Sequence, residues 1–250
     1  TKLKTVLTTI VLATILFTGC KKAKEELDFA IESANHSDDE TMLSNEVDAL
    51  ANDMNATAES NLTLSGREMS TLALPCDATV TIDSVSSPRK VTITYTGSTC
   101  NPQRTRTGTV VYTLPAGVRW KDAGAIMSVT ITNLKITRTS DNKSITLNGT
   151  KTIKNVTGGL LRNLATIGTI THEIASSNMT LTFDDNTQRA WQIAKKRVFT
   201  YNNGIVISTS GNATVDGVSG VSEWGTNRYG NAFSTVITQA MTVRQDCNFR

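Results

Sequence analysis

The chain has 250 residues, and its 38% hydrophobic and 19% charged content supports a packed core, which excludes a globally disordered protein. Aromatic residues contribute only 5%, and abundant Thr, Val, Ile, Asn and Gly favour strands joined by turns. The net charge of +3 hides two regions of opposite sign: residues 25–59 hold eleven acidic and no basic residues, whereas residues 61–250 hold 11 acidic and 20 basic residues.

Residues 1–19 predict a lipoprotein signal peptide. Lys2 and Lys4 form a short positive region, and residues 6–17 form an apolar stretch interrupted only by threonines. This length is typical of a signal peptide rather than of a membrane span. The stretch ends in the pattern of a lipobox, in which signal peptidase II recognises the residues before a cysteine that becomes acylated. The residues of this pattern are Leu16, Phe17, Thr18, Gly19 and Cys20.

Cys20 is therefore predicted to carry the acyl chains that anchor the protein to a bacterial membrane. Each buried CH₂ group contributes about 0.8 kcal/mol, so several chains give durable attachment. The alternatives are an ordinary signal peptide with a chance cysteine, or an apolar anchor. Because the chain starts at Thr1 without a methionine, we expect the natural start to precede it.

Residues 20–72 are expected to form an acidic tether that is partly helical and partly disordered. One helical stripe begins at Leu27, and polar residues 35–38 are expected to interrupt the helix after it. Ser37 or Asp38 is the candidate N-cap of a second helix, because short polar side chains suit that position. The apolar stripe of this second helix comprises Met42, Leu43, Val47, Leu50 and Met54.

Residues 73–250 predict an all-β domain, because apolar and polar residues alternate with the two-residue period of a strand. We expect ten to twelve strands with short turns, which requires antiparallel neighbours. The prediction is a large antiparallel meander, either a curved open sheet or a sandwich, and it is expected to be truncated at its C-terminus. Further strands are expected near 213–224 and 232–243. The apolar members of the clearest alternations are Val80, Ile82, Val91, Ile93, Tyr95, Met127, Val129, Ile131, Ile145, Leu147, Ile153, Met179, Leu181, Phe183, Trp191 and Ile193.

Three local signals refine this meander. The apolar parity switches after Ile131, which predicts a β-bulge near Asn133. The sequence Asn202-Asn203-Gly204 predicts a hairpin turn. A glycine follows Thr, Asn or Ile in three similar segments, at Gly108, Gly149 and Gly168, and is interpreted as marking strand bends or close backbone approaches.

The cysteines other than Cys20 suit an oxidising compartment. If Val85 pairs with Lys90 in the first hairpin, Cys76 faces the residue before Cys100, and a bulge or a frayed end would bring the two sulfurs together. Cys76 and Cys100 are thus the candidate disulfide, which leaves Cys247 unpaired. Its partner is expected in a missing tail, or alternatively it pairs with Cys76 or Cys100.

No residue is assigned to catalysis, to a metal or to a cofactor. His36 lies in the tether, and His172 is expected to be a solvent-exposed strand residue rather than a base. Asp184, Asp185 and Asp216 are interpreted as turn residues rather than glycosidase carboxylates. The tryptophans are expected to serve packing, with a sugar-stacking platform as the alternative; they are Trp120, Trp191 and Trp224.

The whole layout resembles uncharacterised β-rich lipoproteins of Bacteroidota. The resemblance rests on the lipobox ending at Cys20, on the acidic tether, and on a β body that starts at Cys76. Residues 93–100 followed by 104–108, and residues 148–152, are similar to segments of that family. Glu25 and Glu26 resemble its acidic surface-export signals. The resemblance implies an outer-membrane lipoprotein and supplies no catalytic residues.

Three functions follow in order of preference. The first is a non-enzymatic envelope or surface protein for adhesion, structure or glycan binding. The second is a periplasmic carrier of lipid or lipoprotein with a curved sheet, and the third is a polysaccharide hydrolase. The basic body is interpreted as a solvated surface or as a site for anionic glycans or envelope proteins. No nucleic acid is expected, because the sequence has neither a basic helix nor a basic patch interleaved with aromatic residues.

Overall fold

The computed structural model describes residues 2–60, 75–176 and 178–247; the side chains of 2–25, 27, 59 and 60 lie outside this description. The chain divides into two compact units, Thr1–Val47 and Asp48–Arg250, here called the N-terminal unit and the β unit. The prediction of an all-β fold with a large antiparallel sheet is confirmed.

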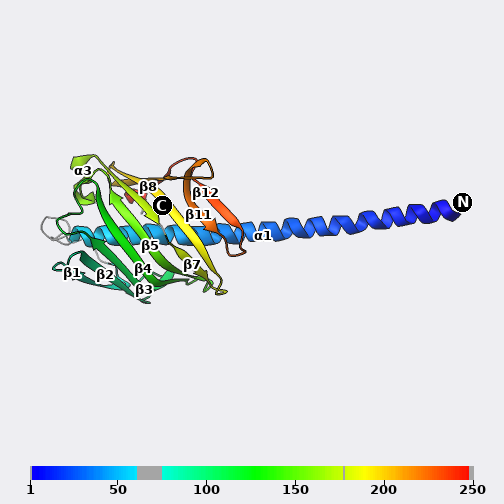
Figure 1. Cartoon of the computed structure of the whole chain (residues 1–250), viewed down its shortest axis with the longest axis horizontal. Helices are drawn as coiled ribbons and strands as arrows, with labels where there is room; N and C mark the ends of the chain where they lie inside the picture. The colour runs from blue at the N-terminus through cyan, green and yellow to red at the C-terminus, as the bar shows by residue number, and fades with distance from the viewer. Residues whose placement is uncertain (1, 61–74, 177, 248–250) are drawn as a thin grey trace. The chain divides into compact units, whose positions relative to one another are not determined.

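Helix α1 extends over Lys2–Ser60, so it begins in the N-terminal unit and ends in the β unit (Figure 1). The expected interruption at residues 35–38 is wrong: these residues are helical, and the hydroxyl of Thr41 donates to the carbonyl of Ser37 at 2.8 Å. The physical reason is that residues 25–59 contain no Gly or Pro, while Asn, Ser and Asp disfavour a helix only weakly. Within the described residues, no helix combines the length and the hydropathy needed to cross a membrane.

Within the described residues, the β unit contains one sheet of thirteen strands, against the ten to twelve expected, and its first six strands form a meander in sequence order. Every pairing in it is antiparallel, which confirms the expected connectivity. The strands are β1 (Ala78–Asp83), β2 (Arg89–Thr96), β3 (Arg104–Leu114), β4 (Ala125–Arg138), β5 (Ser144–Asn155), β6 (Thr169–Ser176), β7 (Thr180–Phe183), β8 (Gln188–Tyr201), β9 (Ile205–Gly211), β10 (Ala213–Val215), β11 (Val218–Thr226), β12 (Ala232–Val236) and β13 (Met241–Arg244).

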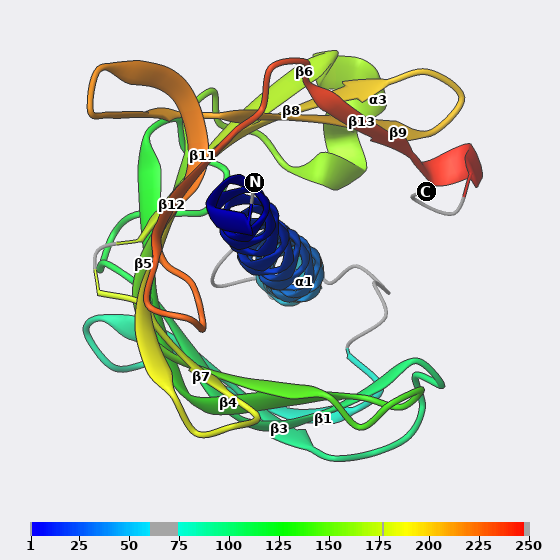
Figure 2. The ribbon, with the colours of Figure 1, turned by 90° about the vertical axis from the view of Figure 1, so that its right-hand side faces the viewer.

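Strand β8 organises the second half of the sheet. On one edge it pairs with β6 and β7, and on the other with β9 and β11. The sheet branches there, because β13 continues from β9 while β10 and β12 continue from β11. The sheet is strongly curved and open, rather than a sandwich (Figure 2).

One face of the sheet is buried and the other is exposed. Along β4, buried and exposed residues alternate up to the bulge, where two exposed residues follow one another and the buried set changes parity. Asn133 has a positive φ of 48°, and the β4–β5 register shifts between Ile131 and Leu134, so the predicted bulge is confirmed. The buried face is the concave side of the curved sheet, and residues 48–60 of α1 lie on it (Figure 2). Leu50 and Met54 of the predicted helical stripe are buried there.

The predicted register of the first hairpin is wrong by two residues. Val80 pairs with Ile93 and Asp83 pairs with Lys90, so the expected pairing of Val85 with Lys90 does not form. The carboxylate of Asp83 accepts hydrogen bonds from the amides of Val85 and Ser86 at 3.1 and 2.9 Å, which ends the strand at Asp83. A shift of two residues preserves the face of every side chain, because side chains alternate with a period of two.

Later segments also depart in detail from the expectation. The strand expected near 213–224 is divided into β10 and β11, and the one near 232–243 into β12 and β13. The body also contains short helical turns, η1 (Leu161–Asn163), α3 (Leu164–Ile167) and η2 (Gln245–Cys247). Gly168 ends α3 with a φ of 86° and so is a helix cap, not a strand bend. The predicted β8–β9 hairpin at residues 202–204 is confirmed.

Gly108 and Gly149 lie where backbones approach closely, as expected. A Cβ atom on Gly108 would lie 2.3 Å from the carbonyl oxygen of Asn133, and one on Gly149 would lie 2.1 Å from the carbonyl oxygen of Asn178. Both glycines also have positive φ angles, 120° and 131°. The curvature of the sheet at the β4 bulge and at the junction of β5 with β7 therefore depends on the lack of a side chain.

We predict that Gly149→Ala lowers the free energy of unfolding by at least about 2 kcal/mol, because backbone strain and a backbone clash combine. Gly117→Ala is the matched control: its φ is 78°, but no atom lies within 4 Å of the added Cβ. This control should show only the left-handed strain of about 1–2 kcal/mol. Denaturant unfolding measures both, and equal losses would contradict the close approach.

Candidate functional site

Charged and polar side chains interrupt the apolar concave face of the β unit. From Trp191 to Phe199 the odd-numbered residues of β8 are buried, and they include Lys195 and Arg197. Cross-strand pairing sets Arg197 beside His172 of β6 and Thr209 of β9, and it sets His172 beside Asn155 of β5. These neighbours form one polar row across four strands, and all are buried: Asn155, His172, Arg197 and Thr209.

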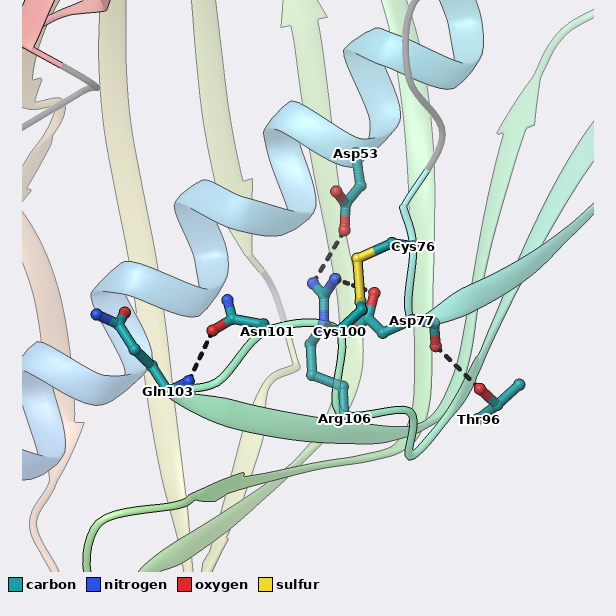
Figure 3. The surroundings of a disulfide bond; sticks show 8 residues. All are labelled: Asp53, Cys76, Asp77, Thr96, Cys100, Asn101, Gln103 and Arg106. Atoms are coloured by element: carbon teal, nitrogen blue, oxygen red, sulfur yellow. Dashed lines mark hydrogen bonds and ion pairs between the residues drawn. A yellow bond between two sulfur atoms is a disulfide. The ribbon is translucent and has the colours of Figure 1, made fainter.

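At β3, the guanidinium of Arg106 binds two carboxylates (Figure 3). Its Nε and Nη2 donate to Asp77 at 2.6 and 2.7 Å, and its Nη1 donates to Asp53 of α1 at 2.9 Å. The hydroxyl of Tyr95 donates to the same oxygen of Asp53 at 2.8 Å, and the guanidinium lies 4.1 Å from the centre of the Tyr95 ring. Arg106 is only 5% exposed, so this is a buried ion cluster with one more carboxylate than cations.

Burial governs the ionisation of this cluster. It raises the pKa of Asp53, against the opposing effects of Arg106 and of the Tyr95 hydrogen bond. The proximity of the Asp77 carboxylate adds to the increase. Burial also raises the pKa of the Tyr95 hydroxyl, so this group stays protonated and acts as a hydrogen-bond donor to Asp53.

The predicted disulfide between Cys76 and Cys100 is confirmed, with a sulfur–sulfur distance of 2.02 Å. It joins the segment before β1 to the loop between β2 and β3, directly beside the ion cluster (Figure 3). Asp77 follows Cys76, and its carbonyl accepts a hydrogen bond from the amide of Thr96 at 3.0 Å. The disulfide and this bond together hold the carboxylate of Asp77 at Arg106. Cys247 is exposed and forms no disulfide with Cys76, Cys100 or another described cysteine.

A second arginine contacts α1 less closely. Nη2 of Arg197 lies 3.4 Å from Oδ1 of Asp48, and the arginine side chain is 3% exposed. Within the part of the chain that the structure describes, Nε and Nη1 of Arg197 and Oδ1 of Asp48 are buried and make no hydrogen bond. Arg197 also lies 5.9 Å from the centre of the Phe199 ring.

Lys195 forms a third ionic contact that lies entirely within the sheet. Its Nζ is 2.8 Å from Oε1 of Glu223, and the indole of Trp191 donates to Oε2 of Glu223 at 2.8 Å. Lys195 and Glu223 are 1% and 2% exposed. Because Glu223 belongs to β11, this cluster connects β11 to β8 across the branch of the sheet.

His172 is buried, not exposed as predicted. It is 3% exposed and lies edge-to-face between Trp120 and Phe199, with ring-centre distances of 5.1 and 4.9 Å. Burial, with a smaller contribution from the charge of Arg197, lowers its pKa to about 3. The imidazole is therefore neutral near pH 7 and serves as an aromatic packing group. The sequence contained a signal of this burial, because His172 lies on the same face of β6 as Ile170 and Ile174.

The other predicted residues lie apart from these clusters. Asp184, Asp185 and Asp216 occupy turns, as expected; Asp184 is 3.1 Å from Arg228, and Asp185 accepts from Thr187. Trp120 and Trp191 are buried in the core, while Trp224 is half-buried. His36 lies within α1.

The predicted lipidation residue Cys20 and its recognition residues Leu16, Phe17, Thr18 and Gly19 lie on the backbone of α1, and their side chains fall outside the described set. The described residues contain no group of three or more His, Cys, Asp or Glu side chains placed to hold a metal ion. Comparisons with family models, curated proteins and solved structures find no match to the chain.

The sequence interpretation missed the buried ions. It interprets the basic body as a solvated surface and does not single out Arg106, Lys195, Arg197 or Glu223, because long charged side chains are rarely buried. The parity of β8 contained a signal, since Lys195 and Arg197 share the face of Trp191 and Phe199. No sequence signal pairs them with acids more than twenty residues away.

We predict that Arg106→Lys lowers the free energy of unfolding by about 2 kcal/mol or more, because one ammonium cannot bind Asp77 bidentately and also reach Asp53. The matched control is Arg138→Lys. Arg138 binds Asp141 through Nε and Nη2 at 3.0 and 2.6 Å, but it is 30% exposed. An exposed pair contributes about 0–1 kcal/mol. Similar losses in the two variants would show that the buried cluster contributes no more than a surface pair.

The depressed pKa of His172 predicts a pH dependence. The unfolded chain binds a proton near pH 6.5 and the folded chain only near pH 3, so stability is lost as the pH falls between these values. His172→Phe keeps the aromatic packing and removes the titration. The wild type should therefore lose about 1.4 kcal/mol per pH unit relative to this variant over that range. Parallel pH curves from denaturant unfolding would contradict a buried neutral His172.

Proposed function

We propose that the protein is an exported, lipid-anchored bacterial lipoprotein that acts by binding or by structural support rather than by catalysis. Export and anchoring are supported by the lipobox pattern that ends at Cys20. They are also supported by the bond between Cys76 and Cys100, because disulfides persist in oxidising compartments. The resemblance to Bacteroidota lipoproteins favours the outer membrane, with the β unit facing either the periplasm or the cell surface.

The observation that carries the non-catalytic proposal is the occupation of the concave face by residues 48–60. A curved sheet offers its ligand site on that face. The cavity that remains beside Met54 and Tyr112 is about 10 Å³, which is space for about one water molecule. Among the described residues, the buried carboxylates of Asp53, Asp77 and Glu223 bind cationic side chains instead of facing a cleft. This arrangement gives little support to a polysaccharide hydrolase, which needs two carboxylates at an open cleft.

The exposed face of the sheet favours contact with polar polymers. Thr94, Thr109 and Thr132 are neighbours across β2, β3 and β4, and Thr130 and Thr150 are neighbours across β4 and β5. Hydroxyl groups spaced by the strand separation of about 4.8 Å can donate and accept hydrogen bonds along a glycan chain. Envelope glycans, including anionic ones, are therefore the partners that we propose for this face.

A carrier of lipid or lipoprotein is the second candidate. The concave face is curved and mostly apolar, which suits an acyl chain, but such cargo would have to replace residues 48–60. The size of the remaining cavity therefore favours the structural and glycan-binding proposal over the carrier.

We predict that Cys20→Ala abolishes acylation and moves the protein from the membrane fraction to the soluble fraction. Labelled palmitate and fractionation of cells that produce the chain behind a start methionine measure the two effects. Cys247→Ala is the control and should retain the label and the membrane location, because Cys247 is exposed and far from the lipobox in sequence. Retention of the label in Cys20→Ala would overturn the proposed anchor.

A further inference from the structure

Residues 48–60 of α1 are bound to the sheet in the way a ligand helix would be. No backbone–backbone hydrogen bond joins them to a strand within the described residues. The polar contacts come from side chains of the sheet: Tyr112 donates to the carbonyl of Leu50 at 3.0 Å, Tyr95 and Arg106 donate to Asp53, and Arg197 lies near Asp48. Removal of this helix would therefore leave the hydrogen-bonded ladders of the sheet intact.

The apolar contacts have the spacing of a helix in a groove. Leu50, Met54 and Ala58 follow one another at intervals of four residues, and together with Ala51 they are at most 3% exposed. This i, i+4 pattern is the recognition mode of an amphipathic helix. The cavity of about 10 Å³ beside Met54 leaves no space for larger side chains, so the groove selects residues of similar volume.

The groove is the part of the concave face that contacts residues 48–60. Its two arginines, Arg106 and Arg197, differ in how many hydrogen bonds they form. Arg106 uses Nε, Nη1 and Nη2 in charged hydrogen bonds of 2.6–2.9 Å. In the described structure, the only ion pair of Arg197 is the 3.4 Å contact with Asp48, and its buried Nε and Nη1 make no hydrogen bond. Oδ1 of Asp48 is also buried without a hydrogen bond. A buried donor without an acceptor is destabilising, so residues 48–60 match one end of the groove and fit the other end poorly.

We propose that this concave face is a binding groove for an acidic amphipathic helix of another protein, and that residues 48–60 are its intramolecular competitor. The partner helix presents a glutamate at the position of Asp48, apolar residues at those of Leu50 and Met54, and a carboxylate at that of Asp53. One added methylene extends the carboxylate by about 1.5 Å. This added reach exceeds the shortfall between the 3.4 Å contact of Asp48 and the roughly 2.7–2.9 Å of a charged hydrogen bond, so the longer side chain can bind Arg197 bidentately. The inference does not depend on the lipid at Cys20.

The competitor determines how the groove has to be tested. A segment joined to the sheet by the same chain has an effective concentration near the millimolar range, so a free helix competes poorly with the intact chain. The variant Asp48→Lys with Asp53→Lys, made in the full chain, opposes like charges to Arg197 and Arg106 and so weakens the binding of the resident helix to the sheet.

The experiment measures binding of fluorescent peptides of residues 44–60 to this full-chain variant and to the wild type. The peptides are the natural sequence, the natural sequence with Asp48→Glu, and the sequence with both Asp→Lys changes. We expect the variant to bind the Asp48→Glu peptide at least tenfold more tightly than the natural peptide, and to bind the Lys peptide weakest. The wild type should bind all three weakly, because its groove is occupied.

Arg197→Met in the same variant provides the matched control. It should bind the Asp48→Glu peptide and the natural peptide equally tightly, while binding through Arg106 remains. This control distinguishes a contact between the glutamate and Arg197 from the higher helix propensity of Glu, which would favour the Asp48→Glu peptide with or without Arg197. Equal affinity for the natural and Asp48→Glu peptides would overturn the proposal and would indicate that the groove accepts the helix of a second copy. A preference that survives Arg197→Met would also overturn it. The absence of peptide binding would overturn the proposal as well, provided that the variant retains its disulfide and the circular dichroism signal of its strands.

Discussion

Buried positive charge on a concave β-sheet is the constraint on which the β unit depends. Arg106, Lys195 and Arg197 lie among apolar side chains, where an uncompensated charge would be strongly destabilising. Each faces an acid that is distant in sequence: Asp53 with Asp77, Glu223 and Asp48, respectively. Of these four acids, Asp48 and Asp53 belong to α1, Glu223 belongs to β11, and Asp77 directly precedes β1. These ion pairs therefore link the helix, the meander and the branch of the sheet. Burial of apolar side chains supplies most of the driving force for folding.

This compensation changes the meaning of the charge asymmetry in the sequence. Eleven acids without a basic neighbour suggested a solvated tether, and an excess of basic residues in the body suggested a surface for anions. Asp48 and Asp53, however, contact arginines of the body. Part of the opposite charge in the two regions is thus complementary within one chain, and the concave face has the character of an anion-binding surface whose first ligand is the chain itself.

The fold was predictable where the information was local. The alternation along β4, the bulge at Asn133 and the turn at residues 202–204 follow from neighbouring residues and are confirmed. The register of the first hairpin was missed because the loop length depends on side-chain hydrogen bonds of Asp83. The Cys76–Cys100 pair was nevertheless predicted, since both cysteines flank that hairpin in either register. The ion clusters were not predictable, because parity identifies the face of Arg197 but not which remote carboxylate approaches it.

The position of β8 has a consequence for the order of assembly. The edge formed by β6 and β7 and the edge of β9 both require β8 as a partner, and Arg197 lies on β8 as well. A chain delivered N-terminus first thus has seven strands, β1–β7, in a growing sheet whose β6–β7 edge is open before residue 188 arrives. The unpaired backbone groups of an open edge can form hydrogen bonds with strands of other chains. Delivery of β8, a segment of fourteen residues, covers that edge and supplies the counter-charge for Asp48 in one step, and its own second edge is then covered by β9 and β11.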